Sequence, residues 1–186
     1  IAAYLVRRRV RISLIVFVGL LIEDVVTGVR PHNVFDPTDP ETLFGCALIF
    51  AGLAIRSWSA GILRKTRELT MTGPYALIRN PLYVGSFFIM AGFCALIDDM
   101  ENYYFVLGPI AGLYFLQVLH EERTLSGLYE SRWADYVRRV PRFLPRSLPQ
   151  SPLATWELSQ WLGSREYRAL GATLLGMLLV QVWRLS

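Results

Sequence analysis

Five long apolar stretches constrain the fold of this 186-residue chain more than any other feature. They cover residues 12–26, 42–63, 82–97, 103–119 and 167–183. A helix needs about 20 apolar residues to cross a bilayer, and the second stretch is about 33 Å long at a rise of about 1.5 Å per residue. The shorter stretches need flanking Tyr, Trp and Arg side chains as anchors at the membrane surface. The pattern predicts an all-α integral membrane bundle of about five transmembrane helices.

The composition agrees with a membrane location. Hydrophobic residues make up 53% of the chain and charged residues 18%, and the mean hydropathy of +0.36 is higher than that of most water-soluble domains. A chain of this length corresponds to about one domain, so we expect a single membrane domain over residues 1–186. Glu23 and Asp24 interrupt the first stretch, and the start at Ile1 leads us to expect that residues upstream are missing.

The loops between the apolar stretches alternate in charge. Arginines precede the first stretch, and the loop after the second stretch is basic as well, whereas the loops before 42–63 and before 103–119 are acidic. Because cytoplasmic loops carry an excess of Lys and Arg, we predict a cytoplasmic N-terminus and cytoplasmic loops at 64–81 and 120–166. A membrane of the endoplasmic reticulum satisfies the same rule.

The surplus of basic residues does not indicate a nucleic-acid partner. The net charge is +4, but the basic residues flank apolar stretches, where they meet anionic lipid headgroups. A nucleic-acid site would need an exposed basic face, so we expect membrane lipids and no nucleic acid as partners. Cys46 and Cys94 lie in apolar stretches, which predicts small buried side chains and neither a disulfide framework nor a zinc site.

The segment 120–166 is too long for a simple connection in so small a protein, and we expect it to contribute to the functional site. Apolar residues recur at intervals of three and four from Glu121 to Val140, which predicts a cytoplasmic helix on the membrane surface or folded over the bundle. Prolines then predict an extended, Pro-rich linker, and they stand at Pro141, Pro145, Pro149 and Pro152.

Arg56 is the first candidate for a functional side chain. A guanidinium within an apolar stretch is costly, so it usually faces the interior of the bundle or a wet cavity and pairs with an anion. The alternative is that its side chain reaches the cytoplasmic headgroups near Leu63.

A second candidate is the segment 69–85. Gly73 and Pro74 mark a turn, and Asn80 followed by Pro81 predicts the capped start of a helix, where free backbone amides can bind a carboxylate or a hydroxyl. The alternative is an ordinary turn at the membrane surface with interfacial tyrosines.

A third candidate is the pair Glu121 and Glu122 at the end of the fourth stretch. Two adjacent acids there suggest binding of a cationic group, and the alternative is a solvated run of charges paired with Arg123. His32 and His120 fall in loops of opposite predicted sidedness, so we expect no metal site. The sequence contains no nucleophile elbow, phosphate loop or dinucleotide fingerprint.

The three candidate segments follow one another in an order that resembles a known family. The pattern comprises Gly73-Pro74-Tyr75, Arg79 to Gly85, Glu121-Glu122 with Leu125, and Tyr136 to Pro145. It resembles the isoprenylcysteine carboxyl methyltransferase family, which is grouped with the membrane phospholipid methyltransferases, over about residues 43–145. The resemblance implies an enzyme that binds S-adenosylmethionine in a pocket at the cytoplasmic face and takes a lipidic acceptor from the bilayer.

The resemblance also implies roles for individual residues. Arg56 matches an arginine that family members need for activity, so we expect it to be catalytic and to hold an anionic acceptor. Substrate contacts are expected from Gln117, Arg79 and Arg139. Cofactor contacts are expected from Arg67, Glu68, Leu69, Thr70, Tyr75, Asn80, Pro81, Leu82, Tyr83 and Glu121.

Some positions depart from the family's pattern. Asn80 stands where a His is usual, Glu130 where a Gly is usual, and Trp133 where a Tyr is usual. Gln117 stands where a prenylcysteine-methylating member has an Arg that binds substrate. Gln117 bears on the recognition of a prenylcysteine carboxylate, and Asn80 bears on the alternative of a scaffold that has lost its chemistry.

The leading hypothesis is therefore an integral-membrane methyltransferase that acts on a lipidic acceptor by isoprenylcysteine-type O-methylation of a carboxylate, without a metal. A carboxylate acceptor needs no general base, whereas a phospholipid amine must lose a proton, for which Glu122 is a candidate. The alternatives are N-methylation of a phospholipid amine, a nicotinamide-dependent reductase of the sterol-reductase type, and a non-catalytic membrane scaffold.

Overall fold

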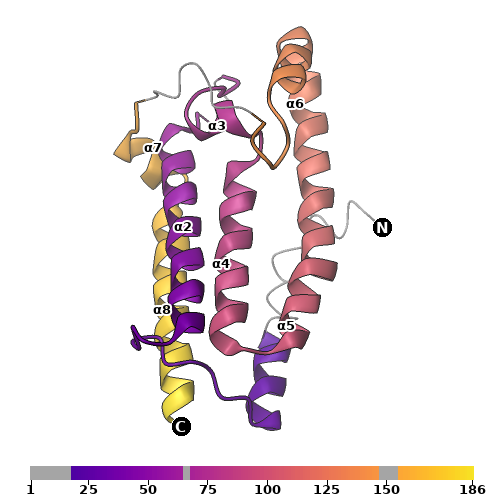
Figure 1. Cartoon of the computed structure of the whole chain (residues 1–186). Coiled ribbons are helices and arrows are strands. Elements are labelled where there is room, and N and C mark those ends of the chain that lie inside the picture. The colour runs from indigo at the N-terminus through magenta and orange to yellow at the C-terminus, as the bar shows by residue number, and fades with distance from the viewer. Residues whose placement is uncertain (1–17, 65–67, 147–154) are drawn as a thin grey trace. The chain divides into compact units, whose positions relative to one another are not determined.

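The computed structural model describes residues 18–64, 68–146 and 155–186, and the regular elements in these ranges are helices (Figure 1). Residues 18–27 are helical, and the loop that follows leads into the first long helix. The further elements are α2 (Pro40–Ile62), α3 (Pro74–Leu77), α4 (Pro81–Ile97), α5 (Met100–Phe105), the π-helical turn η1 (Val106–Ile110), α6 (Ala111–Arg139), α7 (Leu158–Gly163) and α8 (Glu166–Leu185).

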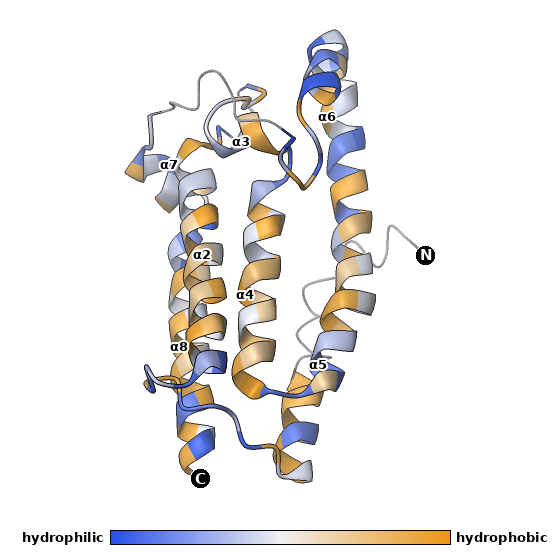
Figure 2. Cartoon of the chain, in the orientation of Figure 1, coloured by the Kyte–Doolittle hydropathy of each residue, from blue (hydrophilic) through white to orange (hydrophobic). Residues whose placement is uncertain are grey.

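Three of the described helices are long and apolar enough to cross a membrane: Pro40–Ile62, the continuous run Met100–Arg139, and Glu166–Leu185. Pro81–Ile97 is apolar but shorter, at 17 residues. Apolar residues extend along most of α2, α4 and α8 (Figure 2). The all-helical membrane fold expected from the sequence is confirmed, whereas the number of five crossings and their sidedness stay predictions. Residues 12–17 of the first expected span lie outside the described residues.

The predicted spans 42–63 and 167–183 agree with α2 and α8 to within a few residues. The expected fourth span and the helix from Glu121 to Val140 follow one another in the helical run Met100–Arg139, which has a kink at Glu130. The cytoplasmic location of the second part stays a prediction. Pro109 lies in the π-helical turn of this run. Proline lacks the amide that would bond one turn back, which favours such a local widening without ending the helix.

The chain divides into two compact units, each built from segments far apart in sequence. Unit 1 contains the described residues up to Ile49, together with Met90–Leu119 and Leu174–Ser186. Unit 2 contains Phe50–Ile89 and His120–Thr173, as far as they are described.

Close approach of α2 and α4 organises unit 1. A Cβ added at Gly45 would lie 2.9 Å from the Gly92 carbonyl oxygen, and one added at Gly92 would lie 2.6 Å from the Gly45 carbonyl oxygen. Small residues allow this backbone contact, which is a common means of helix association in membranes. Ile49 and Leu96 are fully buried beside it.

A close contact of α2 and α4 at two glycines is present in unit 2 as well. A Cβ added at Gly52 would lie 2.5 Å from the Gly85 carbonyl oxygen, and one added at Gly85 would lie 2.7 Å from the Gly52 carbonyl oxygen. A second part of the unit 2 core lies around the end of α6, where Leu69, Trp133, Tyr136 and Val140 are buried together. This cluster ties the segment before α3 to α6.

Candidate functional site

Unit 2 contains a cavity of about 490 Å³, which lies within the usual size range of small-molecule sites. Residues from the end of α2, the segment around α3, the start of α4 and the middle of α6 form its wall. They are Leu63, Arg64, Glu68, Leu69, Thr70, Tyr75, Asn80, Pro81, Leu82, Tyr83, His120, Glu121, Thr124, Leu125, Leu128, Tyr129 and Tyr136. The wall is thus mainly apolar and aromatic, with a few acids and hydroxyls.

The turn before α3 positions the first aromatic side chain of this wall. Gly73 has φ 59° and ψ −134°, a backbone conformation that favours glycine. Pro74 follows at the start of the helix, where a missing amide costs little. The Tyr136 hydroxyl donates a hydrogen bond to the Tyr75 carbonyl oxygen at 2.7 Å, which fixes α3 to α6.

The hydroxyl of Tyr75 is buried and has no hydrogen-bond partner among the described residues. Burial raises the pKa of Tyr75 well above its ordinary range, so the hydroxyl stays protonated. An unsatisfied buried hydroxyl is costly. A polar ligand in the cavity that Tyr75 lines would remove this cost.

Glu121 is held in the cavity wall by an aromatic side chain. The Tyr83 hydroxyl, on α4, donates a hydrogen bond to Glu121 Oε1 at 2.7 Å. Both residues line the cavity. The arrangement presents a carboxylate of fixed orientation, which suits the binding of a positively charged group.

Glu122, the neighbouring acid, is engaged differently. Its carboxylate accepts hydrogen bonds from Arg142 Nη2 at 2.7 Å and from Asn80 Nδ2 at 3.0 Å, and Arg79 Nε lies 3.3 Å away. The Arg79 guanidinium also lies 5.8 Å from the ring centre of Trp133. Glu122 therefore joins α6 to the start of α4 and to the segment after α6, and its oxygens are already occupied.

Arg56 forms the second polar centre of unit 2. Its Nε and Nη2 donate hydrogen bonds to the two carboxylate oxygens of Glu166, at 2.6 and 3.0 Å, and its Nη1 donates to Ser86 Oγ. The side chain of Glu166 is only 7% exposed and that of Arg56 only 20%. Gly85 leaves room for this arginine, because a Cβ there would lie 2.6 Å from Arg56 Cγ. The expected pairing of Arg56 with an anion is present, and the partner is Glu166.

The structure gathers nine of the ten predicted cofactor residues around the cavity, and the tenth, Arg67, lies outside the described residues. Their role as cofactor contacts stays a prediction. The predicted substrate residues do not line the cavity: Arg79 is bound to Glu122, Arg139 is exposed at the end of α6, and Gln117 is buried in unit 1. Arg56 also lies outside the cavity wall.

Two site residues were missed by the sequence analysis. Glu166 begins α8 and is nearly buried. A signal for it exists in the sequence, since an acid at the start of an apolar span has an unmatched charge that calls for a partner. Arg142, the partner of Glu122, stands between two prolines in the segment that was expected to be a linker, and nothing local to it indicates the contact.

A comparison with known families matches residues 40–132, half of the chain, to the phospholipid methyltransferase family. The match includes α2, α3, α4 and most of α6, and with them most of the cavity wall. The chain belongs to the phospholipid methyltransferase family. This family also covers the relatives of isoprenylcysteine carboxyl methyltransferase, so the resemblance seen in the sequence is confirmed. Family membership and the apolar helices support a membrane methyltransferase.

Two curated proteins are similar to this chain. The nickel-cobalt-cadmium resistance protein NccN of Alcaligenes xylosoxydans xylosoxydans is 30% identical over 153 residues, which are 77% of this chain and 68% of that protein. The cobalt-zinc-cadmium resistance protein CzcN of Cupriavidus metallidurans is 30% identical over 116 residues, which are 61% of this chain and 52% of that protein. No solved structure matches the chain.

Proposed function

We propose that this chain binds S-adenosylmethionine in the unit 2 cavity and methylates a lipidic acceptor. The observation that carries the proposal is the composition of the cavity wall, which contains the oriented carboxylate of Glu121 and also Tyr75, whose buried hydroxyl has no hydrogen-bond partner among the described residues. The cofactor has an ammonium group, a carboxylate and an aromatic base. A mainly apolar wall with few polar groups fits such a molecule.

Each part of the wall has a task in this proposal. Glu121, held by Tyr83, binds the ammonium group, and the Tyr75 hydroxyl gains the partner that it lacks. Leu69, Leu125 and other apolar side chains of the wall enclose the base and exclude water. The bound cofactor supplies an activated methyl group on a sulfonium. Because such a donor needs little covalent help, catalysis by the chain consists of positioning the acceptor and keeping the site dry.

For the acceptor we propose a carboxylate of the isoprenylcysteine type. A carboxylate oxygen attacks the methyl group without losing a proton, whereas an amine needs a base. Glu122, the candidate base, already accepts hydrogen bonds from Arg142 and Asn80 and lies beside Arg79. Removing it from these donors to take up a proton would break the link between α4 and α6.

The second candidate is N-methylation of a phospholipid amine, and the family description favours it. In this case a base other than Glu122 has to take up the proton. The two candidates share the cofactor site and differ only in the acceptor.

The first experiment tests the cofactor. Purified full-length protein in detergent is titrated calorimetrically with S-adenosylhomocysteine, and we expect one site per chain with micromolar affinity. Glu121→Gln should weaken binding about tenfold or more, because a hydrogen bond to a charged group contributes about 1.5–3 kcal/mol. Tyr75→Phe should also weaken it. Asp135→Asn, an exposed carboxylate on the same helix as Glu121, is the matched control and should bind as the wild type does.

A folded protein that binds no S-adenosylhomocysteine would overturn the proposal and leave the reductase and scaffold alternatives. Titration with a nicotinamide dinucleotide separates these two. If the cofactor binds, transfer of a labelled methyl group is measured to a prenylcysteine and, separately, to phosphatidylethanolamine vesicles. A methyl ester releases methanol in alkali whereas an N-methyl group does not, so the product identifies the acceptor class.

The names of the two relatives suggest a setting for this reaction. Both names refer to resistance against cobalt and cadmium. We propose that methylation of a membrane component by this chain raises the tolerance of cells to such metals. A metal-sensitive host that expresses the chain should grow at higher Co²⁺ concentrations than one that expresses Glu121→Gln. Equal growth of the two would exclude a contribution of methylation.

A further inference from the structure

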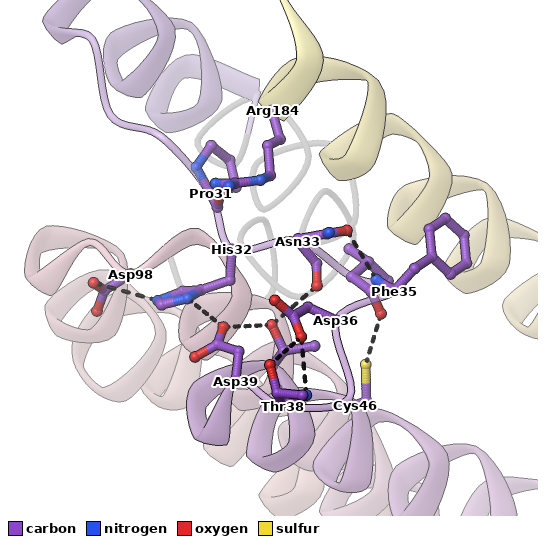
Figure 3. A network of polar contacts seen from close by, with 12 residues as sticks. Pro31, His32, Asn33, Phe35, Asp36, Thr38, Asp39, Cys46, Asp98 and Arg184 are labelled. Carbon is purple, nitrogen blue, oxygen red and sulfur yellow. Dashed lines mark hydrogen bonds and ion pairs between the residues drawn. The ribbon is translucent and has the colours of Figure 1, made fainter.

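A second polar centre lies in unit 1, in the loop before α2 (Figure 3). His32, Asp39 and Glu41 each offer one ligand atom, and these atoms all lie within 4.8 Å of one another. Methyl transfer in unit 2 does not use this group. The cluster combines an imidazole with two carboxylates.

The geometry of His32 is the first observation that points to a ligand. Its Nδ1 lies 2.6 Å from Asp39 Oδ2, and its Nε2 lies 3.5 Å from Asp98 Oδ2 on the other side of the ring (Figure 3). A histidine that binds a metal usually directs its second ring nitrogen to a carboxylate, which fixes the orientation of the ring. Asp98, at the end of α4, stands in that position.

The backbone of the loop holds His32 in place. The His32 amide donates a hydrogen bond to the Leu96 carbonyl oxygen at 2.8 Å. Arg184, on α8, donates a hydrogen bond to the carbonyl oxygen of the preceding residue, Pro31, also at 2.8 Å (Figure 3). The imidazole is therefore presented by a backbone that α4 and α8 fix from two sides within unit 1.

The partner carboxylate is held as well. Thr42 Oγ1 lies 2.7 Å from Asp39 Oδ2 and 3.1 Å from the Asn33 carbonyl oxygen. Glu41, in the first turn of α2, is exposed, so its flexible side chain can close the remaining separation from the other two ligands. Two ligands are thus preorganised and one is adjustable.

We propose that His32, Asp39 and Glu41 bind one divalent first-row transition-metal ion, with Asp98 orienting the imidazole. Imidazole nitrogen combined with carboxylate oxygen suits Zn²⁺ and its neighbours, whereas Mg²⁺ and Ca²⁺ prefer oxygen ligands alone. Three protein ligands leave a position for water. Further acids in the neighbouring turns, at Asp36, Asp99 and Glu101, favour the approach of a cation.

This proposal differs from the expectation of no metal site that the sequence supports. That expectation considered His32 together with His120, whereas the structure combines His32 with acids seven and nine residues further on. The proposed site is independent of the proposed methyl transfer, since no residue of the unit 2 cavity contributes to it. Failure of one proposal leaves the other intact.

The test is calorimetric titration of the full chain with Zn²⁺ alone, in detergent and after treatment with a chelator. We expect one Zn²⁺ per chain, a rise of the unfolding temperature with Zn²⁺, and no displacement by millimolar Mg²⁺. His32→Gln should abolish measurable binding. Asp98→Asn should weaken it about 10- to 100-fold, as for other carboxylates that orient a metal-bound histidine.

Glu41→Gln keeps the test decisive if the other variants do not fold. Because Glu41 is exposed, this variant should fold, and its Zn²⁺ affinity should be at least tenfold lower (about 1.4 kcal/mol). Asp135→Asn, which removes an exposed carboxylate of unit 2, is the control and should bind Zn²⁺ as the wild type does. Two results would overturn the proposal. One is an equal Zn²⁺ affinity of wild type, Glu41→Gln and His32→Gln, and the other is displacement of the bound Zn²⁺ by millimolar Mg²⁺.

Discussion

The polar network around Arg56 in unit 2 and the network around His32 in unit 1 differ in how far apart their partners lie in the sequence. Arg56 pairs with Glu166, 110 residues away, and with Ser86, 30 residues away. His32 pairs with Asp39 within seven residues. The Arg56 pair fastens separate helices to one another, whereas the His32–Asp39 pair lies within one loop, which Asp98 and Arg184 connect to the end of α4 and to α8.

The two networks also differ in burial. In the Arg56 pair the side chain of Glu166 is 7% exposed and that of Arg56 20%, whereas in the His32 pair the two side chains are 23% and 22% exposed. The difference lies in Glu166. Breaking a buried ion pair leaves a charge without compensation, but a group that water can reach is re-solvated. We therefore expect substitutions in the Arg56 network to affect stability, and those in the His32 network to affect mainly ligand binding and pH dependence.

The largest effect is expected from Glu166→Leu, which leaves the guanidinium of Arg56 without its partner. Removing one member of a buried pair typically costs about 3–5 kcal/mol. Thermal unfolding in detergent measures the loss. Asp135→Asn, which breaks the exposed pair with Arg138, should change the stability by less than about 1 kcal/mol. Equal effects of the two substitutions would show that the Arg56 network does not fasten the helices.

Each unit contains a close contact between glycines of α2 and α4, so substitutions at these glycines should have similar effects in the two units. Gly52→Ala places a Cβ 2.5 Å from the Gly85 carbonyl oxygen, and we expect a loss of about 1–3 kcal/mol, as for other overpacked sites. Gly45→Ala should cost about as much in unit 1, where the neighbouring backbone is 2.9 Å away. Gly171→Ala meets no atom within 4 Å and should stabilise α8 by about 0.4–1 kcal/mol. A stable Gly52→Ala variant would contradict the close approach of α2 and α4.

The difference in sequence separation also explains what could be predicted from the sequence. The apolar stretches, and Asn80 followed by Pro81, are local signals, and they located α2, α4 and α8 well. At Pro74 the sequence predicted a turn, whereas the structure has the short helix α3. Nine cofactor candidates were found through a family pattern that preserves order along the chain. Glu166 and Arg142 were missed because the identity of their partners depends on how segments distant in sequence pack. The position of Glu166 at the start of an apolar span indicates that it needs a partner but not which one. The helix α7 was missed because the prolines before it predict an extended chain.

Within unit 2, a substitution at Glu130 should stabilise the fold rather than destabilise it. Glu130 has φ 40° and ψ −109° at the kink of α6, a sparsely populated conformation that costs a residue with a side chain about 1–3 kcal/mol. The family usually has Gly at this position, so Glu130→Gly should raise the free energy of unfolding by about 1 kcal/mol. Ala134→Gly, one turn further along the regular part of α6, should instead lower it by about 1 kcal/mol. Chemical denaturation of both variants measures the difference, and a loss of stability in Glu130→Gly would show that the kink is not strained.

The smallest effect is expected from Thr42→Val in the His32 network. The hydrogen bond from Thr42 is the main reason why the pKa of Asp39 is lowered to about 2. A carboxylate whose pKa is lower in the folded than in the unfolded state, where it is about 3.9, stabilises the fold above pH 4 and loses that contribution as the pH falls towards 2. Without the Thr42 hydroxyl this pKa rises, so the variant has less stability to lose in that interval.

The measurement is the unfolding temperature of wild type and Thr42→Val from pH 6 to pH 2. At pH 6 the variant should be slightly less stable, and the two curves should converge towards pH 2. Thr27→Val is the control, because the Thr27 hydroxyl donates to the backbone carbonyl oxygen of Glu23 and its loss should shift the curve equally at every pH. Parallel curves of wild type and Thr42→Val would mean that the pKa of Asp39 does not depend on the Thr42 hydroxyl. Convergence would show that the contact of Thr42 with Asp39 stabilises the fold through the charge of the Asp39 carboxylate, whereas the Arg56 pair stabilises it by joining helices.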